Sequence, residues 1–343
     1  MRPLLNTLFV TTQGAYLAKE GQTVTVKVGQ EVRLRVPVHT VSGIVCFGQV
    51  SCSPFLMGFC AENNVEISFL TENGRFLARV QGPVSGNVLL RREQYRKADD
   101  LSAASAVASA IVAAKVANAR AVIGRTLRDH PQKTDVAALR DASERLRRRI
   151  ERLGGLTSLD EIRGIEGDCG RIYFAVFRHF VTTEGEAFRF MERSRRPPLD
   201  NMNALLSFIY TLLMHDFSSA IECVGLDRQV GFLHRDRPGR AGLALDLMEE
   251  FRPFFADRLA LSLVNLRQVR ARGFKKSESG AVVMNDETRK EVLTAYQSRK
   301  RDEIMHPFIK EKVPVGQLFF VQALLFARFV RGDLDGYPAF FWK

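Results

Sequence analysis

Four side chains that could bind a divalent cation occur in three polar segments of this 343-residue chain. Glu166 stands between glycines in RGIEGDCGRIYF, and His234 begins the polar part of VGFLHRDRPGR. Asp246 and Glu249 both belong to AGLALDLMEEFRP. Three carboxylates and one imidazole form a hard, mostly oxygen ligand set, which suits Mg²⁺ or Mn²⁺ better than a metal that prefers thiolates. We therefore expect a divalent-metal centre where these segments meet.

Glu166 directly precedes a strongly apolar run, so we place it at the N-terminus of a helix, where the helix dipole favours a carboxylate. At such a position it could be only a capping charge. However, Gly164 and Gly167 on either side let backbone or substrate come close. This spacing makes Glu166 a candidate metal ligand, and the capping alternative stays open.

Asp246 and Glu249 are three residues apart on a predicted helix, so they share one face of it. The leucines around Asp246 predict that it is drawn toward the core, where an unpaired carboxylate is costly. A metal ion would neutralise it. Glu250 is the alternative donor, but we expect it to face outward, toward Arg252 or Arg258.

His234 alone is weak evidence, because a single histidine in a loop is most often an ordinary surface residue. Its surroundings add weight, since arginines near these segments could meet phosphate oxygens. A divalent ion among carboxylates and arginines indicates phosphodiester chemistry, in which the metal polarises the phosphoryl group. The candidate DNA-contacting arginines are Arg163, Arg171, Arg235, Arg237 and Arg240.

Composition supports a polyanionic partner. The chain has 50 Lys and Arg against 38 Asp and Glu, a net charge of +12, which attracts nucleic acid or an acidic membrane surface. The five cysteines form no CxxC pair, which argues against a zinc ribbon and a disulfide framework. The first residues lack the apolar run of a signal peptide, so we expect a cytoplasmic protein.

The elements that must position these residues fall into an α+β arrangement of two domains. Residues 1–90 predict a small β-rich domain, with hairpins around Glu20-Gly21 and Asn73-Gly74, an alternating strand EVRLRVPV, and one short helix that Ser53 caps. Residues 91–343 carry 3.6-residue periodicity almost throughout and predict a larger all-α catalytic domain. A short hairpin involving residues 281–284 is the one exception.

The segment RSRRPPLDNMNALLSFIYTLL predicts a well-defined helix start, with Pro197-Pro198 stiffening the entry and Asp200 as the N-cap. Tyr210, further along this helix, has two interpretations. It could be a core residue whose hydroxyl finds a partner, or it could line the cleft and contact DNA.

Taken in order, these segments resemble the first family of CRISPR-associated (Cas) proteins, the integrases of spacer acquisition. The resemblance rests on RGIEGDCGRIYF, RSRRPPLDNMNALLSFIYTLL, VGFLHRDRPGRAGLALDLMEEFRP and RDEIMHPF, and LFVTTQGAYL and AAKVANARAVIGR extend it to nearly the whole chain. The ending VQALLFARFVRGDLDGYPAFFW looks like the branch found in type I-C systems.

The resemblance implies a metal site of Glu166, His234 and Glu249, with Asp246 at a second, supporting acidic position. It implies metal-dependent DNA cleavage and transesterification, in which a prespacer 3′-hydroxyl attacks a phosphodiester at the edge of the repeat array. Some members have Asp where this chain has Glu249. The family forms homodimers, and a small dimeric adaptation subunit bridges two of them; we expect the β-rich domain to contribute to the homodimer, because its hairpins expose sheet edges.

Two other functions compete with this prediction. A non-catalytic, basic DNA-binding scaffold would show salt-sensitive binding that is indifferent to the metal-site residues. A metal-dependent hydrolase of a small phosphate ester would not need arginines spread over several helices.

Overall fold

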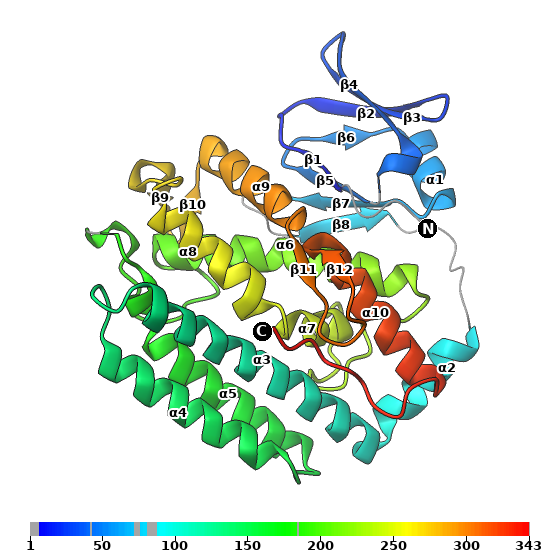
Figure 1. Cartoon of the computed structure of the whole chain (residues 1–343). Helices are drawn as coiled ribbons and strands as arrows, with labels where there is room; N and C mark the ends of the chain where they lie inside the picture. Colours follow the sequence, from blue (N-terminus) through cyan, green and yellow to red (C-terminus); the bar gives the residue numbers. More distant parts are fainter. Residues whose placement is uncertain (1–6, 42, 72–75, 81–87, 184, 343) are drawn as a thin grey trace. The chain divides into compact units, whose positions relative to one another are not determined.

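The computed structural model describes residues 7–41, 43–71, 76–80, 88–183 and 185–342. The chain divides into two compact units, residues 1–86 and 87–343. As predicted, a β-rich N-terminal part precedes a larger helical part, in which the described helices begin at Val88 (Figure 1).

The first unit contains two four-stranded sheets. Its elements are β1 (Thr7–Val10), β2 (Ala15–Glu20), β3 (Thr23–Val28), β4 (Glu31–Pro37), η1 (Val38–Thr40), β5 (Gly43–Phe47), β6 (Ser51–Cys52), α1 (Pro54–Glu62), β7 (Glu66–Leu70) and β8 (Phe76–Val80). One sheet has the strand order β4-β3-β2-β6, and the other has the order β1-β5-β7-β8. Apolar faces of both sheets and of α1 form one core around residues such as Leu17, Ile44, Leu56 and Ile67.

The predicted hairpin around Glu20-Gly21 is confirmed, because β2 and β3 pair antiparallel from Glu20 with Thr23 onward. Ser53 caps α1 by accepting a hydrogen bond from the Leu56 backbone N–H at 3.1 Å. β7 and β8 also pair antiparallel, but the turn at Asn73-Gly74 lies outside the described residues. β4, predicted to be half-buried, is instead mostly exposed on both faces, and it lies at the edge of its sheet, paired with β3.

The second unit is built mainly from long helices. They are α2 (Val88–Asp99), α3 (Leu101–Asp129), α4 (Val136–Leu153), α5 (Leu159–Ala175), α6 (Asn201–Cys223), α7 (Gly242–Glu249), α8 (Arg258–Asn265), α9 (Asp286–Lys300) and α10 (Val315–Arg331). Short 3-10 helices η2 (Phe177–Phe180), η3 (Glu186–Phe188) and η5 (Ala271–Gly273) lie between them, and the π-helix η4 (Arg252–Asp257) leads directly into α8. α3, α4 and α5 lie side by side, and α7 contacts both α3 and α6 (Figure 1).

Side-chain caps fix where the site-bearing helices begin. Asp100 caps α3 by accepting from the Ser102 and Ala103 backbone N–H groups, so the continuous helical sequence from Arg91 onward is broken into two helices. Asp200 caps α6 by accepting from Asn203 N at 2.7 Å, as predicted.

α3 and α6 are also long and apolar enough to cross a membrane, but 56% and 72% of their apolar windows are buried inside the protein. Packing therefore accounts for their composition.

Among its described residues, two small hairpins interrupt the helical unit. β9 (Phe274–Lys276) pairs with β10 (Val282–Met284), as predicted from residues 281–284. β11 (Glu303–Met305) pairs with β12 (Lys312–Pro314), which the sequence did not predict. The cysteines are all free thiols, in agreement with the predicted lack of a disulfide framework.

Candidate active site

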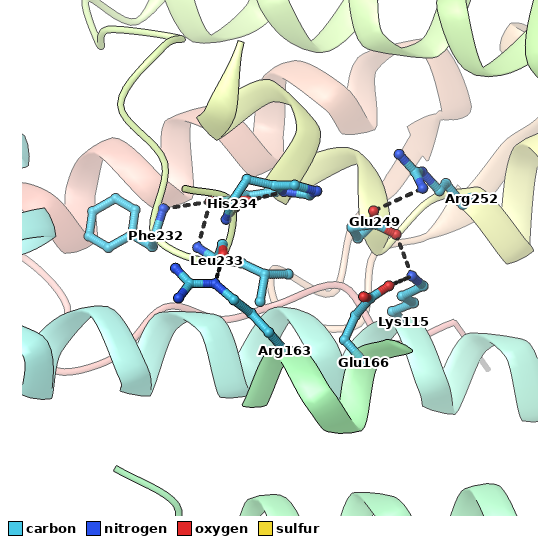
Figure 2. Close-up of polar contacts among 9 residues, drawn as sticks. Lys115, Arg163, Glu166, Phe232, Leu233, His234, Glu249 and Arg252 are labelled. Carbon is cyan, nitrogen blue, oxygen red and sulfur yellow. Dashed lines mark hydrogen bonds and ion pairs between the residues drawn. The ribbon is translucent and has the colours of Figure 1, made fainter. Parts of the chain in front are cut away.

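A lysine and two glutamates from three helices form the centre of the site. Lys115 of α3 donates to Glu166 Oε1 of α5 and lies 2.7 Å from Glu249 Oε2 at the end of α7 (Figure 2). Arg252 of η4 approaches the other oxygen of Glu249, with Nη1 2.9 Å from Oε1. Residues far apart in the sequence thus converge, and both oxygens of Glu249 face a cation.

Burial and charge oppose each other at this cluster. Burial raises the pKa of Glu249, which is only 1% exposed, but Arg252 and Lys115 outweigh it and lower the pKa to about 2. Burial likewise disfavours the Lys115 ammonium, but the charges of Glu249 and Glu166 raise its pKa above the usual value. Glu249 and Lys115 are therefore both ionised at neutral pH.

Glu166 lies in the middle of α5, and the prediction that it begins a helix was wrong. The helix begins earlier because Ser158 caps it through the Glu161 backbone N–H. Gly164 and Gly167 are inside the helix and are tolerated there despite their low helix propensity. Glu166 is therefore not a capping charge, and its carboxylate turns toward α3 and α7.

His234 and Asp246 form the second half of the site. His234 lies in the loop between α6 and α7, and its Nδ1 is 2.6 Å from Asp246 Oδ1. The fully buried Asp246 also accepts backbone N–H bonds from Phe232, Leu233 and His234, at 2.6, 3.0 and 3.0 Å. The expectation that a metal ion compensates the burial of Asp246 is therefore wrong, because these donors already satisfy its carboxylate.

Two glycines let the His234 loop lie against α7. A Cβ atom on Gly242 would be 2.5 Å from the Gln229 carbonyl oxygen, and one on Gly231 would be 2.8 Å from Asp246 Oδ2. Arg163 of α5 also binds this loop, because its Nε donates a hydrogen bond to the Leu233 carbonyl oxygen at 2.6 Å (Figure 2).

Glu250 was expected to face outward, and the structure corrects this. Its side chain is fully buried, and it accepts hydrogen bonds from the Tyr337 hydroxyl at 2.7 Å and the Phe340 backbone N–H at 2.6 Å. Burial raises its pKa to about 8. Arg252, the partner expected for Glu250, binds Glu249 instead. Glu250 therefore attaches the C-terminal segment to the end of α7.

The donor set fits a hard divalent cation, although not in its present contacts. Within the described ranges, no three His, Cys, Asp or Glu side chains form a group that could hold a metal ion as they stand. Figure 2 shows the His234 ring and the carboxylates of Glu166 and Glu249 turned toward the same part of the site. Both carboxylates already share one cation, the Lys115 ammonium. A divalent ion thus meets suitable ligands if Lys115 moves.

A pocket of about 510 Å³ opens beside Glu166. Tyr210 lines it and donates its hydroxyl proton to Asp257 Oδ1 at 2.5 Å, so its hydroxyl has a partner and its ring faces the pocket, while DNA contact by Tyr210 stays a prediction. The Arg252 guanidinium lies 4.9 Å from the centre of the Tyr210 ring. Burial raises the pKa of Asp257 to about 6. The pocket wall thus combines arginine, aromatic and carboxyl groups next to the two glutamates.

The candidate DNA-contacting arginines differ in their surroundings. Arg163 is half-buried and structural, whereas Arg171 is exposed and pairs with Asp168 on its own helix. Arg235 is exposed and pairs with Asp160. Within the part of the chain that the structure describes, Arg237 and Arg240 form no ion pair. Arg171 is the one of the five that lines the pocket.

Three functional residues were missed from the sequence. Lys115 carried a usable signal, because it is the only charged residue between Leu101 and Ala119, and a single charge in an alanine-rich helix needs a partner. Arg252 was considered only as a partner for Glu250, and Asp257 follows FRPFF with no local pattern to distinguish it.

The chain is similar to known proteins over its whole length. Residues 8–298 match the family model described as CRISPR associated protein Cas1. The chain is 54% identical over 343 residues to a CRISPR-associated endonuclease Cas1 of Chlorobaculum tepidum, and 49% identical over 347 residues to one of Rhodospirillum rubrum, covering 100% of both chains in each case.

Solved structures show the same fold. A Cas1 protein from Thermotoga maritima has a TM-score of 0.82 at 23% identity, and the match covers 98% of this chain and 100% of that one. A casposase bound to its integration product has a TM-score of 0.83 at 21% identity, with 98% and 94% covered.

Proposed function

This chain belongs to the Cas1 family of CRISPR-associated proteins, and we propose that it is a metal-dependent DNA endonuclease and integrase of CRISPR adaptation. In this role it cleaves DNA and joins prespacer 3′-hydroxyl ends to the repeat array by transesterification. The observation that carries the proposal is the convergence of Glu166 and Glu249 on one cation position, with the His234 ring turned toward it.

Glu166, Glu249 and the Nε2 atom of His234 would hold Mg²⁺ or Mn²⁺. When bound, such an ion polarises a phosphoryl group and stabilises the attacking or leaving oxygen. Asp246 keeps the proton of His234 on Nδ1 and thereby leaves the Nε2 lone pair for coordination. Arg252 fixes the Glu249 carboxylate, and Arg171 offers its guanidinium to phosphate oxygens at the pocket.

We also propose the partners of this reaction. A Cas1 from a Cas1–DNA complex shares the fold at a TM-score of 0.53, and a chain of a Cas6-RT-Cas1–Cas2 complex shares it at 0.82, although this chain covers only 36% of the latter. In these complexes the partners of the neighbours are DNA and Cas2. For this chain we propose double-stranded DNA, a second copy of the chain and a small dimeric subunit of the Cas2 kind. We place the protein in the cytoplasm and in the type I-C branch, with the β-rich unit contributing to the homodimer.

Strand transfer with purified protein tests the proposal. Glu166→Gln, His234→Ala and Glu249→Gln should each abolish Mg²⁺- or Mn²⁺-dependent cleavage and joining while the circular-dichroism spectrum stays helical. Glu161→Gln, an exposed residue on the same helix as Glu166, is the matched control and should keep activity. Full activity in any folded variant of the three removes that residue from the mechanism.

The same variants separate an enzyme from a non-catalytic DNA-binding scaffold. A scaffold binds DNA in a salt-dependent way but performs no metal-dependent strand transfer even in the unaltered chain.

A further inference from the structure

Lys115 holds both glutamates of the candidate metal site at once. Its side chain is only 14% exposed, and it lies among apolar and small residues of α3. Its ammonium contacts one oxygen of Glu166 and one oxygen of Glu249, from two different helices (Figure 2). A lysine in this position compensates the charges of two carboxylates that would otherwise repel each other.

A cationic side chain contacts each oxygen of Glu249, so a divalent ion must displace one of them to bind this carboxylate. Arg252 contacts Oε1 and Lys115 contacts Oε2, so no oxygen of Glu249 lacks a cationic neighbour. Arg252 is also held over the face of Tyr210. Lys115 is the cation that touches both glutamates, and its flexible four-carbon stem allows its ammonium to move.

The pocket provides a place for the displaced ammonium. Lys115 lines the 510 Å³ pocket together with Glu166 and Tyr210, so a change of side-chain rotamer can turn its ammonium from the carboxylates to the pocket. There it would meet the phosphate groups of a DNA strand rather than the carboxylates.

We propose that Lys115 is an exchangeable internal counter-cation, which occupies the position between Glu166 and Glu249 and must be displaced for a divalent ion to bind. This rests on the metal site of the proposed function. Lys115 compensates the charges of the buried Glu249 and the half-buried Glu166 in the absence of metal, and it weakens the affinity of the site for the ion. It thereby links metal occupancy to the arrival of an alternative anion, the DNA backbone.

Replacing Lys115 with methionine tests this without reference to catalysis. Calorimetric titration of Lys115→Met with Mn²⁺ should give a dissociation constant about tenfold or more below that of the unaltered chain, because a competing charge has gone. In chelator the variant should unfold at a lower temperature than the unaltered chain, and Mn²⁺ should raise its unfolding temperature by more. A variant that folds only when Mn²⁺ is present supports the proposal, and one that stays unfolded with saturating Mn²⁺ overturns it.

Lys300→Met is the matched control. The Lys300 side chain is 4% exposed, and its ammonium lies 2.9 Å from both oxygens of Asp216, away from the candidate ligands. Its loss should lower stability without any extra stabilisation by Mn²⁺. If Lys115→Met and the unaltered chain bind Mn²⁺ with equal affinity and are stabilised by it equally, the proposal for Lys115 is overturned, while the metal site itself stands. Absence of Mn²⁺ binding in both chains overturns the metal site itself, and the Lys115 proposal with it.

Discussion

His234 Nδ1 lies 2.6 Å from Asp246 Oδ1, while the same carboxylate accepts three backbone hydrogen bonds from the loop that carries His234. Asp246 therefore holds His234 in position at two points, the ring nitrogen Nδ1 and the backbone N–H. A carboxylate that orients a metal-binding histidine in this way acts on the metal without touching it. This assigns Asp246 a positioning role, in contrast to the ligand roles proposed for Glu166 and Glu249.

Asp246→Asn should weaken metal binding by about 10–100-fold, because the Nδ1–H loses its charged acceptor and the ring is held less firmly. A titration of strand transfer against Mn²⁺ concentration measures this, with the half-saturating concentration as the readout. Activity should recover substantially at high Mn²⁺. A loss of activity that is the same at every Mn²⁺ concentration would show that Asp246 only stabilises the loop.

Protonation of Asp257 should make stability depend on pH. Burial raises its pKa from 3.8 to about 6, so between these values the folded chain retains a proton that the unfolded chain releases. The stabilisation is complete below the unfolded pKa and is lost as pH rises through the folded pKa. A shift of about two pKa units corresponds to roughly 3 kcal/mol.

Asp257→Asn tests this dependence, because asparagine stays neutral and can still accept the Tyr210 hydroxyl proton. The free energy of unfolding is measured in urea from pH 4 to pH 7 for both chains. As pH rises, it should fall in the unaltered chain relative to the variant. A difference between the two chains that stays constant over this range would exclude an elevated Asp257 pKa.

Local patterns predicted the elements but not all of the contacts that complete the site. The spacing of Asp246 and Glu249 correctly predicted a shared helix, because helical periodicity acts within a few residues. The orientation of Glu250 depends instead on Tyr337 and Phe340, which are 87 and 90 residues away in the sequence. Nothing in AGLALDLMEEFRP indicates these partners, so its burial could not be predicted.

Glu166 shows a different limit. The apolar run after it suggested a helix start, but Ser158, eight positions earlier, is the residue that caps α5. A serine followed by two acidic residues in a first turn is a usable start signal, and it outweighs the low helix propensity of Gly164 and Gly167. Lys115, likewise, was predictable as an anomaly but not as the partner of two glutamates, because its contacts come from other helices.

Arg237, which is exposed, and Arg240, which is half-buried, should contribute to DNA affinity rather than to catalysis. Arg237→Gln and Arg240→Gln should each weaken DNA binding to a similar extent for all sequences. Each should also lower the slope of log binding constant against log salt concentration by about 1, the contribution of one phosphate contact. Fluorescence anisotropy at several salt concentrations measures both quantities. Arg147→Gln serves as the control, because Arg147 is already paired with Glu144 and Glu151 on α4. An unchanged salt slope in both loop variants would place the DNA elsewhere.

The two glycines that flank Glu166 offer a way to separate stability from substrate approach. A Cβ atom added at Gly164 or Gly167 would meet nothing within 4 Å, and both residues are inside α5. Each change to alanine should therefore raise the free energy of unfolding by about 0.5–1 kcal/mol, because alanine loses less conformational entropy in a helix. Gly167 lines the pocket beside Glu166, whereas Gly164 does not.

If DNA approaches the helix backbone at the pocket, Gly167→Ala should lower strand transfer although the protein is more stable, while Gly164→Ala keeps full activity. Thermal unfolding and strand-transfer assays on the same preparations give both values. Because the two substitutions add the same methyl group to the same helix, a difference between them reports the position of the substrate and not the helix. Equal activity in both variants would place the reacting strand away from this face of α5.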